Sequence, residues 1–126
     1  MAPISVTLAR RDPPAAVVAL VGEHDAYSAQ RLEGELALLI DSGRRIVVDL
    51  RDTVFVDSTT LSVLLAARRR AEQASLGFAL VLHERDYTQV HQLLDLTGLG
   101  RAFAISGKLD EALALVRAGR SDAQAA

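Results

Sequence analysis

The chain has 126 residues, half of them hydrophobic and only 4% aromatic, with 14 basic and 16 acidic side chains and a formal net charge of −2. This length fits one domain with an aliphatic core, and the charge balance gives no concentrated basic face for a nucleic acid. The absence of cysteine excludes disulfides, thiolate metal sites and cysteine nucleophiles. Because no signal-like N-terminal segment or membrane-length apolar run occurs, we expect a soluble intracellular protein without membrane insertion.

The N-terminal half predicts two strands, a helix and a third strand. Apolar and polar side chains alternate at residues 4–8, which is the period of a half-buried strand. The runs at 15–21 and 46–50 are apolar throughout, as in strands that are covered on both faces. Between these runs, apolar residues at helical spacing predict a helix over about 28–42, with Ser28 as its capping residue.

The C-terminal half alternates helices and strands. Each helix shows one apolar face, and each strand is a short run of apolar residues. In chain order, a helix follows residues 57–60, and then come a strand at 78–82, a helix at 90–97, a strand at 103–105 and a helix at 109–116.

The element order is therefore β-β-α-β-α-β-α-β-α. Strands that alternate with helices predict an α/β fold with a mixed, mostly parallel sheet of about five strands and four helices, and the opening strand pair adds an antiparallel edge. We expect one domain over residues 1–119, followed by a frayed tail at 120–126 that has nothing to bury.

Four polar residues, Asp57, Ser58, Thr59 and Thr60, interrupt apolar sequence that is typical of a core (VFVDSTTLSVLL, residues 54–65). The first N–H groups of a helix lack partners, so capping explains one or two of these side chains. A serine hydroxyl at a helix N-terminus also lies in the positive end of the helix dipole, where an added phosphate is tolerated. Such a phosphate would bring about −1.5 to −2 charges beside Asp57 and repel a docked partner.

Three segments carry a resemblance to a known family. Gly-Glu-His-Asp spans residues 22–25, FVDSTTL spans 55–61 and VHQLLDLTGL spans 90–99. In order and spacing they resemble the Gly-Glu-Leu-Asp loop, the Asp-Ser-Ser/Thr-Gly-Leu phosphorylation motif and the helix ending in Ser/Thr-Gly-Leu of the STAS domains of bacterial anti-sigma factor antagonists. The sequence departs from that pattern at Thr60, which replaces the family's glycine with a stiffer, β-branched residue, and at Ser62, which replaces a second glycine.

The resemblance implies a cytoplasmic regulator that is neither an enzyme nor a cofactor-binding protein. In the family, the unphosphorylated antagonist binds an anti-sigma factor that is also a serine kinase and thereby frees a sigma factor. The kinase phosphorylates the serine after the aspartate, here Ser58 with Thr59 as the second choice, and a phosphatase resets the protein. The partner-binding residues implied by the resemblance are Asp25, Asp57, Ser58, Thr59, Thr60 and Ser62.

Other interpretations stay open at this point. Thr60 in place of glycine favours a STAS-like scaffold subunit of a signalling or transport complex that has no phosphorylation switch. A hydrolase built on Ser58, His24 and Asp25 would lack both a G-x-S-x-G elbow and a second glycine-rich loop. A receiver domain phosphorylated at Asp49 would require an adjacent acidic pair after its first parallel strand, which the sequence does not have. The three histidines are too dispersed to predict a metal site.

Overall fold

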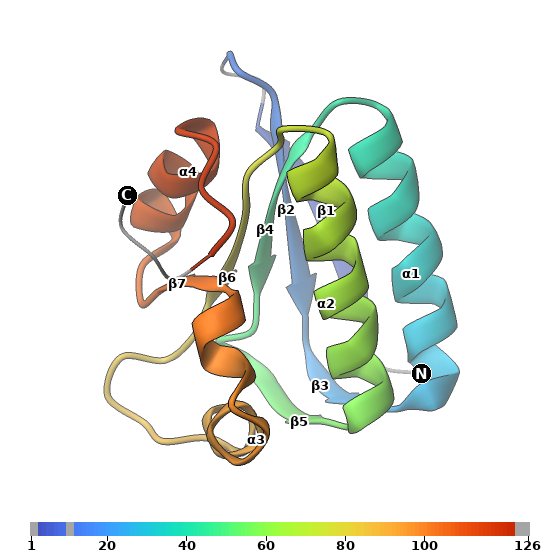
Figure 1. Cartoon of the computed structure of the whole chain (residues 1–126). Helices are drawn as coiled ribbons and strands as arrows, with labels where there is room; N and C mark the ends of the chain where they lie inside the picture. The colour runs from blue at the N-terminus through green and yellow to red at the C-terminus, as the bar shows by residue number, and fades with distance from the viewer. Residues whose placement is uncertain (1–2, 10–11, 123–126) are drawn as a thin grey trace.

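The structure is a computed structural model that describes residues 3–9 and 12–122 (Figure 1). No helix in these two ranges has the length and apolar character needed to cross a membrane. The elements in chain order are β1 (Ile4–Ala9), β2 (Ala15–Leu20), β3 (Gly22–His24), α1 (Ala26–Asp41), β4 (Arg45–Asp49), β5 (Thr53–Val56), α2 (Ser58–Gln73), β6 (Phe78–Val81), α3 (Gln89–Thr97), the 3-10 helix η1 (Leu99–Ala102), β7 (Ala104–Ser106) and α4 (Leu109–Arg117).

Within the described residues, five strands form the main sheet in the order β1-β2-β4-β6-β7. Strand β1 runs antiparallel to β2, with Ile4 opposite Leu20, and the remaining neighbours are parallel. The predicted mixed, mostly parallel sheet of five strands with four α-helices is thus confirmed.

Helices cover both faces of the main sheet (Figure 1), and the two faces bury different side chains. Val48 and Leu80 belong to the core that α1, α2 and α3 cover, whereas Val47 and Val81 belong to the smaller core under α4. Helix α4 packs closely, because a Cβ atom added at Gly77 would lie 2.3 Å from the carbonyl oxygen of Val116. Burial on both faces explains why these strands read as continuous apolar runs.

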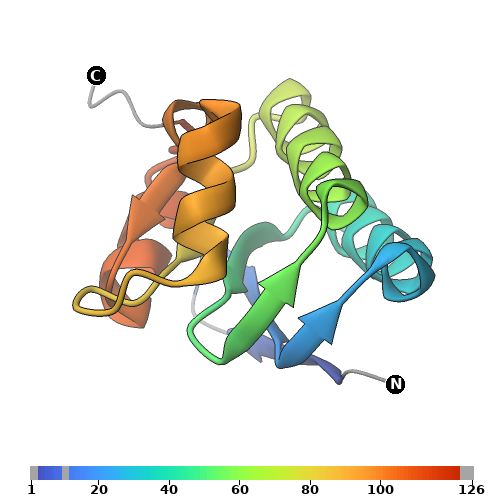
Figure 2. The same ribbon diagram turned by 90° about the horizontal axis from the view of Figure 1, so that it is seen from below.

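A second, two-stranded sheet was not predicted. Strands β3 and β5 pair in parallel, with His24 beside Val56, and they point toward the starts of α1 and α2 (Figure 2). The expectation that the apolar residues around the polar motif belong to the core was wrong for the first two, because Val54 is 66% and Phe55 is 41% exposed. Short strands with outward apolar side chains lack the alternation that sequence reading depends on.

Helix α1 begins earlier than predicted, at Ala26, because its capping residue is Asp25 and not Ser28. The Asp25 Oδ1 atom accepts the N–H groups of Tyr27 at 3.0 Å and Ser28 at 3.3 Å. The Ser28 hydroxyl lies instead on the buried side of the helix, 3.1 Å from His24 Nδ1.

The segment after α4 is attached to the main sheet. The Phe78 N–H donates to the Arg120 carbonyl at 2.9 Å, and the Ala104 N–H donates to the Ser121 carbonyl at 3.3 Å. The prediction of a tail that frays from residue 120 was therefore wrong for Arg120 and Ser121. Residues 123–126, the rest of that predicted tail, lie outside the described residues.

Candidate functional site

Two helix N-termini lie side by side at the ends of the small sheet. Because His24 and Val56 are partners in a parallel register, the residues that follow them, Asp25 and Asp57, begin α1 and α2 at the same end of the molecule (Figure 2). Both aspartates have extended backbone conformations and cap their helices. The arrangement brings two carboxylates and two positive helix ends together.

Asp57 is the capping residue among the four polar residues of the motif. Its Oδ1 atom accepts the backbone N–H of Thr60 at 2.8 Å and lies 3.0 Å from the Thr60 hydroxyl. One carboxylate oxygen of Asp57 is thus used inside the helix start, and the side chain is half-buried.

Thr60 connects the two loops of the site from within. Its side chain is fully buried, and its hydroxyl lies 3.2 Å from the His24 carbonyl, which also accepts the Asp57 N–H at 3.2 Å. The prediction that Thr60 contacts a partner was wrong, because no partner atom reaches a buried side chain. The residue that replaces the family's glycine is therefore an internal bridge between the end of β3 and the start of α2.

Ser58, the first residue of α2, is exposed, as are Thr59, Ser62 and Asp25. None of the hydrogen bonds found in the described part of the chain involves the hydroxyl of Ser58 or Thr59. Asp57 satisfies the N–H of the third helical residue, and the two preceding first-turn N–H groups point out of the helix end. A phosphoryl group on Ser58 would meet these N–H groups and the helix dipole, whereas it would add to the negative charge of Asp57 and Asp25.

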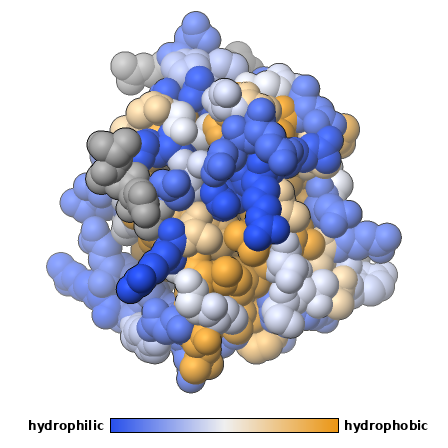
Figure 3. Space-filling view, in the orientation of Figure 1, coloured by the Kyte–Doolittle hydropathy of each residue, from blue (hydrophilic) through white to orange (hydrophobic). Residues whose placement is uncertain are grey.

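Hydrophobic side chains lie near these helix starts in the sequence and in the fold. Tyr27, two residues after Asp25, is 77% exposed, and Phe55, two residues before Asp57, is 41% exposed. In the lower half of the face shown in Figure 3, hydrophobic surface gathers between α2 and α3. Sequence reading missed both aromatic residues as surface features. Their positions in the sequence, within two residues of the two capping aspartates, could have indicated that they lie at the surface.

The geometry does not support a hydrolase. The His24 ring is fully buried, its Nε2–H donates to the Val21 carbonyl at 3.1 Å, and its Nδ1 atom pairs with Ser28. Both ring nitrogens are therefore used away from Ser58, and no nucleophile–base pair is formed.

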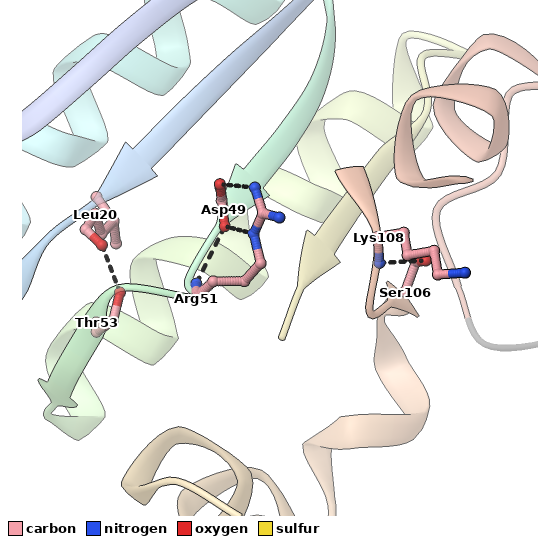
Figure 4. A network of polar contacts seen from close by, with 6 residues as sticks. All are labelled: Leu20, Asp49, Arg51, Thr53, Ser106 and Lys108. Carbon is pink, nitrogen blue, oxygen red and sulfur yellow. Dashed lines mark hydrogen bonds and ion pairs between the residues drawn. The ribbon is translucent and has the colours of Figure 1, made fainter. Parts of the chain in front are cut away.

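Asp49 is engaged by Arg51, which turns back onto it at the end of β4 (Figure 4). The Arg51 Nε–H donates to Oδ1 at 2.9 Å, and the Nη2 atom donates to Oδ2 at 2.8 Å. Burial acts to raise the pKa of Asp49, but the hydrogen bonds and charge of Arg51 outweigh it and lower that pKa below its usual value. With both carboxylate oxygens paired, the receiver interpretation has no support.

The same view shows a hydrogen bond between the two sheets. The Thr53 hydroxyl, at the start of β5, donates to the Leu20 carbonyl at the end of β2, at 2.7 Å in a buried position. In the same view, the Lys108 N–H donates to the Ser106 hydroxyl at 3.2 Å before α4. The Thr53 contact fixes where the small sheet begins.

Comparison with known proteins agrees with this architecture. A family model described as "Mlab, STAS domain" matches residues 7–116. The anti-sigma-F factor antagonist RsfB of Mycobacterium tuberculosis is 31% identical over 123 residues, which cover 96% of this chain and 98% of RsfB. A crystal structure of an anti-sigma factor antagonist from Mycobacterium paratuberculosis is 28% identical, covers 91% of this chain and 95% of that one, and gives a TM-score of 0.70.

The fold is also that of the Bacillus cell fate determinant SpoIIAA in its phosphorylated form, which is 20% identical and gives a TM-score of 0.62 over 89% of this chain and 99% of that one. The family model spans most of the sequence, and RsfB aligns over almost its full length. The chain therefore belongs to the STAS domain family, and these relatives within it are anti-sigma factor antagonists.

Proposed function

We propose that the protein is an anti-sigma factor antagonist that works by partner switching. In its unphosphorylated form it binds an anti-sigma factor serine kinase in the cytoplasm and thereby releases a sigma factor. Phosphorylation of Ser58 by that kinase separates the complex, and a phosphatase restores the binding form. The observation that carries the proposal is the exposed, unengaged Ser58 hydroxyl at the N-terminus of α2.

The charge change accounts for release. A phosphate on Ser58 adds about −1.5 to −2 charges beside Asp57 and three residues after the exposed Phe55. A partner that covers this surface would have to desolvate the phosphate or face it with like charge. A thousandfold loss of affinity corresponds to about 4 kcal/mol, which is within the reach of one such group.

The first test is phosphorylation in vitro. The purified protein is mixed with its cognate kinase and Mg-ATP, and the phosphate is located by mass spectrometry. The neighbouring genes are inspected first, and a histidine-kinase-like ATPase encoded there would be the kinase to use. We expect one phosphate on Ser58, its loss in Ser58→Ala, and unchanged incorporation in Ser42→Ala, a control at an exposed serine that follows the far end of α1. Phosphate that never appears on Ser58 or Thr59 would contradict the proposal.

The second test is binding. Ser58→Asp should weaken binding to the anti-sigma factor at least tenfold, measured by isothermal titration calorimetry. Ser58→Ala should bind like the wild type and resist release on addition of ATP. Equal affinities of the two variants would count against a charge-based switch.

A second candidate is a scaffold subunit of a signalling or transport complex. The buried Thr60 in place of the family's glycine favours it. A scaffold would co-purify stably with a partner that is not a kinase, and Ser58→Asp would leave that association unchanged. The binding comparison of the two Ser58 variants therefore separates the two candidates.

A further inference from the structure

Strand β5 has a strand partner on one edge, and a side chain completes its other edge. Along the first edge it pairs with β3. On the second edge, Gln89 Oε1 accepts the Val56 N–H at 2.9 Å, and Gln89 Nε2 donates to the Val56 carbonyl at 2.9 Å. A primary amide thus supplies the donor and the acceptor that a neighbouring strand would supply. Because Gln89 is the first residue of α3, this pair joins α3 to β5.

Val56 lies directly before the helix start that carries Ser58. The Val56 side chain is buried, and the next residue, Asp57, donates its N–H to the His24 carbonyl at 3.2 Å. The backbone leading into α2 is thus fixed by His24 on one side and by Gln89 on the other. Without Gln89, two backbone groups of a buried residue would lose their partners, and the strand end would be free to shift.

We infer that Gln89 is a positioning residue for Ser58, and this inference rests on the function proposed above. Its amide fixes the junction between β5 and α2, and therefore the place at which the Ser58 hydroxyl is presented to a partner or kinase. The two hydrogen bonds of the Gln89 amide go to Val56 and not to Ser58, so its effect passes through the backbone of Val56 and Asp57.

Helix α3 has independent anchors, which makes the inference testable. The Thr88 hydroxyl caps the helix together with His91, whose Nδ1 atom accepts the Thr88 N–H at 3.1 Å. Val90 and Leu94 are buried in the main core. A change at Gln89 therefore removes its two hydrogen bonds and leaves α3 folded and in place.

The experiment compares Gln89→Met, which keeps the side-chain length and helix propensity, with Gln92→Met at an exposed position of the same helix. Amide hydrogen exchange measured by NMR reports protection at Val56, Asp57 and, as a marker of global unfolding, Val48 in β4. We expect protection at Val56 and Asp57 to fall at least tenfold relative to Val48 in Gln89→Met. The affinity for the anti-sigma factor kinase should fall at least fivefold, whereas Gln92→Met should leave every value within twofold of wild type.

Two results would overturn the role of Gln89. In the first, Asp57 protection in Gln89→Met stays within twofold of that in Gln92→Met. In the second, protection falls but both variants bind the kinase equally. A wild-type protein that binds no kinase would instead overturn the proposed function, and Asp57 protection would still decide whether Gln89 positions the junction. A second variant, Gln89→Glu, keeps the acceptor and removes the donor to the Val56 carbonyl, so an intermediate loss of protection supports the same role.

Discussion

The main sheet and the β3–β5 sheet are stabilised by different forces. Every residue of β6 in the main sheet is buried, and its neighbours β4 and β7 pair with it on both edges. In the small sheet, two of the four residues of β5 are exposed, and its fixed points are side-chain hydrogen bonds from Thr53, Thr60 and Gln89. Burial stabilises the first sheet, whereas directed hydrogen bonds locate the second.

This difference follows from what a recognition site requires. Apolar burial is strong but non-directional, and it removes the buried groups from solvent. In the function proposed above, a kinase reaches the Ser58 hydroxyl, which therefore has to stay exposed, and its position depends on hydrogen bonds made by the backbone around it. Variants in the main sheet should therefore lower the stability of the whole fold, whereas variants in the β3–β5 sheet should mainly displace the backbone near Ser58.

The largest effect is expected for Leu80→Ala in β6, an interior strand of the main sheet. Leu80 is fully buried, and its truncation leaves a cavity that should lower the free energy of unfolding by about 2–5 kcal/mol. Urea unfolding followed by circular dichroism measures this change. Leu96→Ala, at a position that is 78% exposed, is the control and should change stability by less than about 0.5 kcal/mol. Similar losses of unfolding free energy in both variants would contradict the view that burial stabilises the main sheet.

An intermediate effect is expected for Thr60→Val, which keeps the shape of the side chain and removes its hydroxyl. Loss of the contacts to the His24 carbonyl and the Asp57 carboxylate should lower stability by about 1–3 kcal/mol. Hydrogen exchange at Asp57 should increase more than exchange in the main sheet. Thr59→Val, one residue earlier and exposed, is the matched control and should leave both measurements nearly unchanged. If the two variants behave alike, the Thr60 bridge does not position the helix start.

The smallest effect is expected for Arg51→Gln, and it depends on pH. Arg51 lowers the pKa of Asp49 below the usual 3.8, so the pair stabilises the fold above that value, and the stabilisation is lost as the pH falls through the folded-state pKa. Because the Arg51 side chain is 38% exposed, solvent screening limits the difference at pH 7 to less than about 1 kcal/mol. Denaturant unfolding at pH 7 and at about pH 2 should show this difference disappearing in acid. Arg69→Gln, at an exposed position of α2, serves as the control. If the stability difference between Arg51→Gln and the wild type persisted in acid, it would come from packing of the Arg51 side chain and not from its charge.

The same contrast explains what the sequence could predict. Strands were predicted at 15–21, 46–50 and 78–82, within one residue of β2, β4 and β6 at each end, because burial on both faces produces unbroken apolar runs. Strands β3 and β5 were missed because Gly22–His24 is too short to show a period and because Val54 points outward. The contact between Gln89 and Val56 joins residues 33 positions apart, so no local sequence pattern predicts it.

At the site, the sequence predicted that one or two of the four polar residues cap the helix and that the Ser58 hydroxyl is exposed; the structure has Asp57 as the cap and Ser58 exposed. Phosphorylation of Ser58 stays a prediction. The expectation that Thr60 contacts a partner came from the family resemblance. The helical phase of Thr60 gave the opposite answer, since this residue precedes the buried Leu64 by four residues and therefore shares its face.

The hydrogen bonds made after α4 have a practical consequence for reporter fusions. A fluorescent protein joined directly after Gly119 would remove the carbonyls that accept from Phe78 and Ala104, and it would disturb the two strands beneath them. A reporter joined beyond Asp122 keeps those acceptors and places its linker at the end of the molecule away from Ser58. In-cell imaging of this protein should therefore use the longer junction.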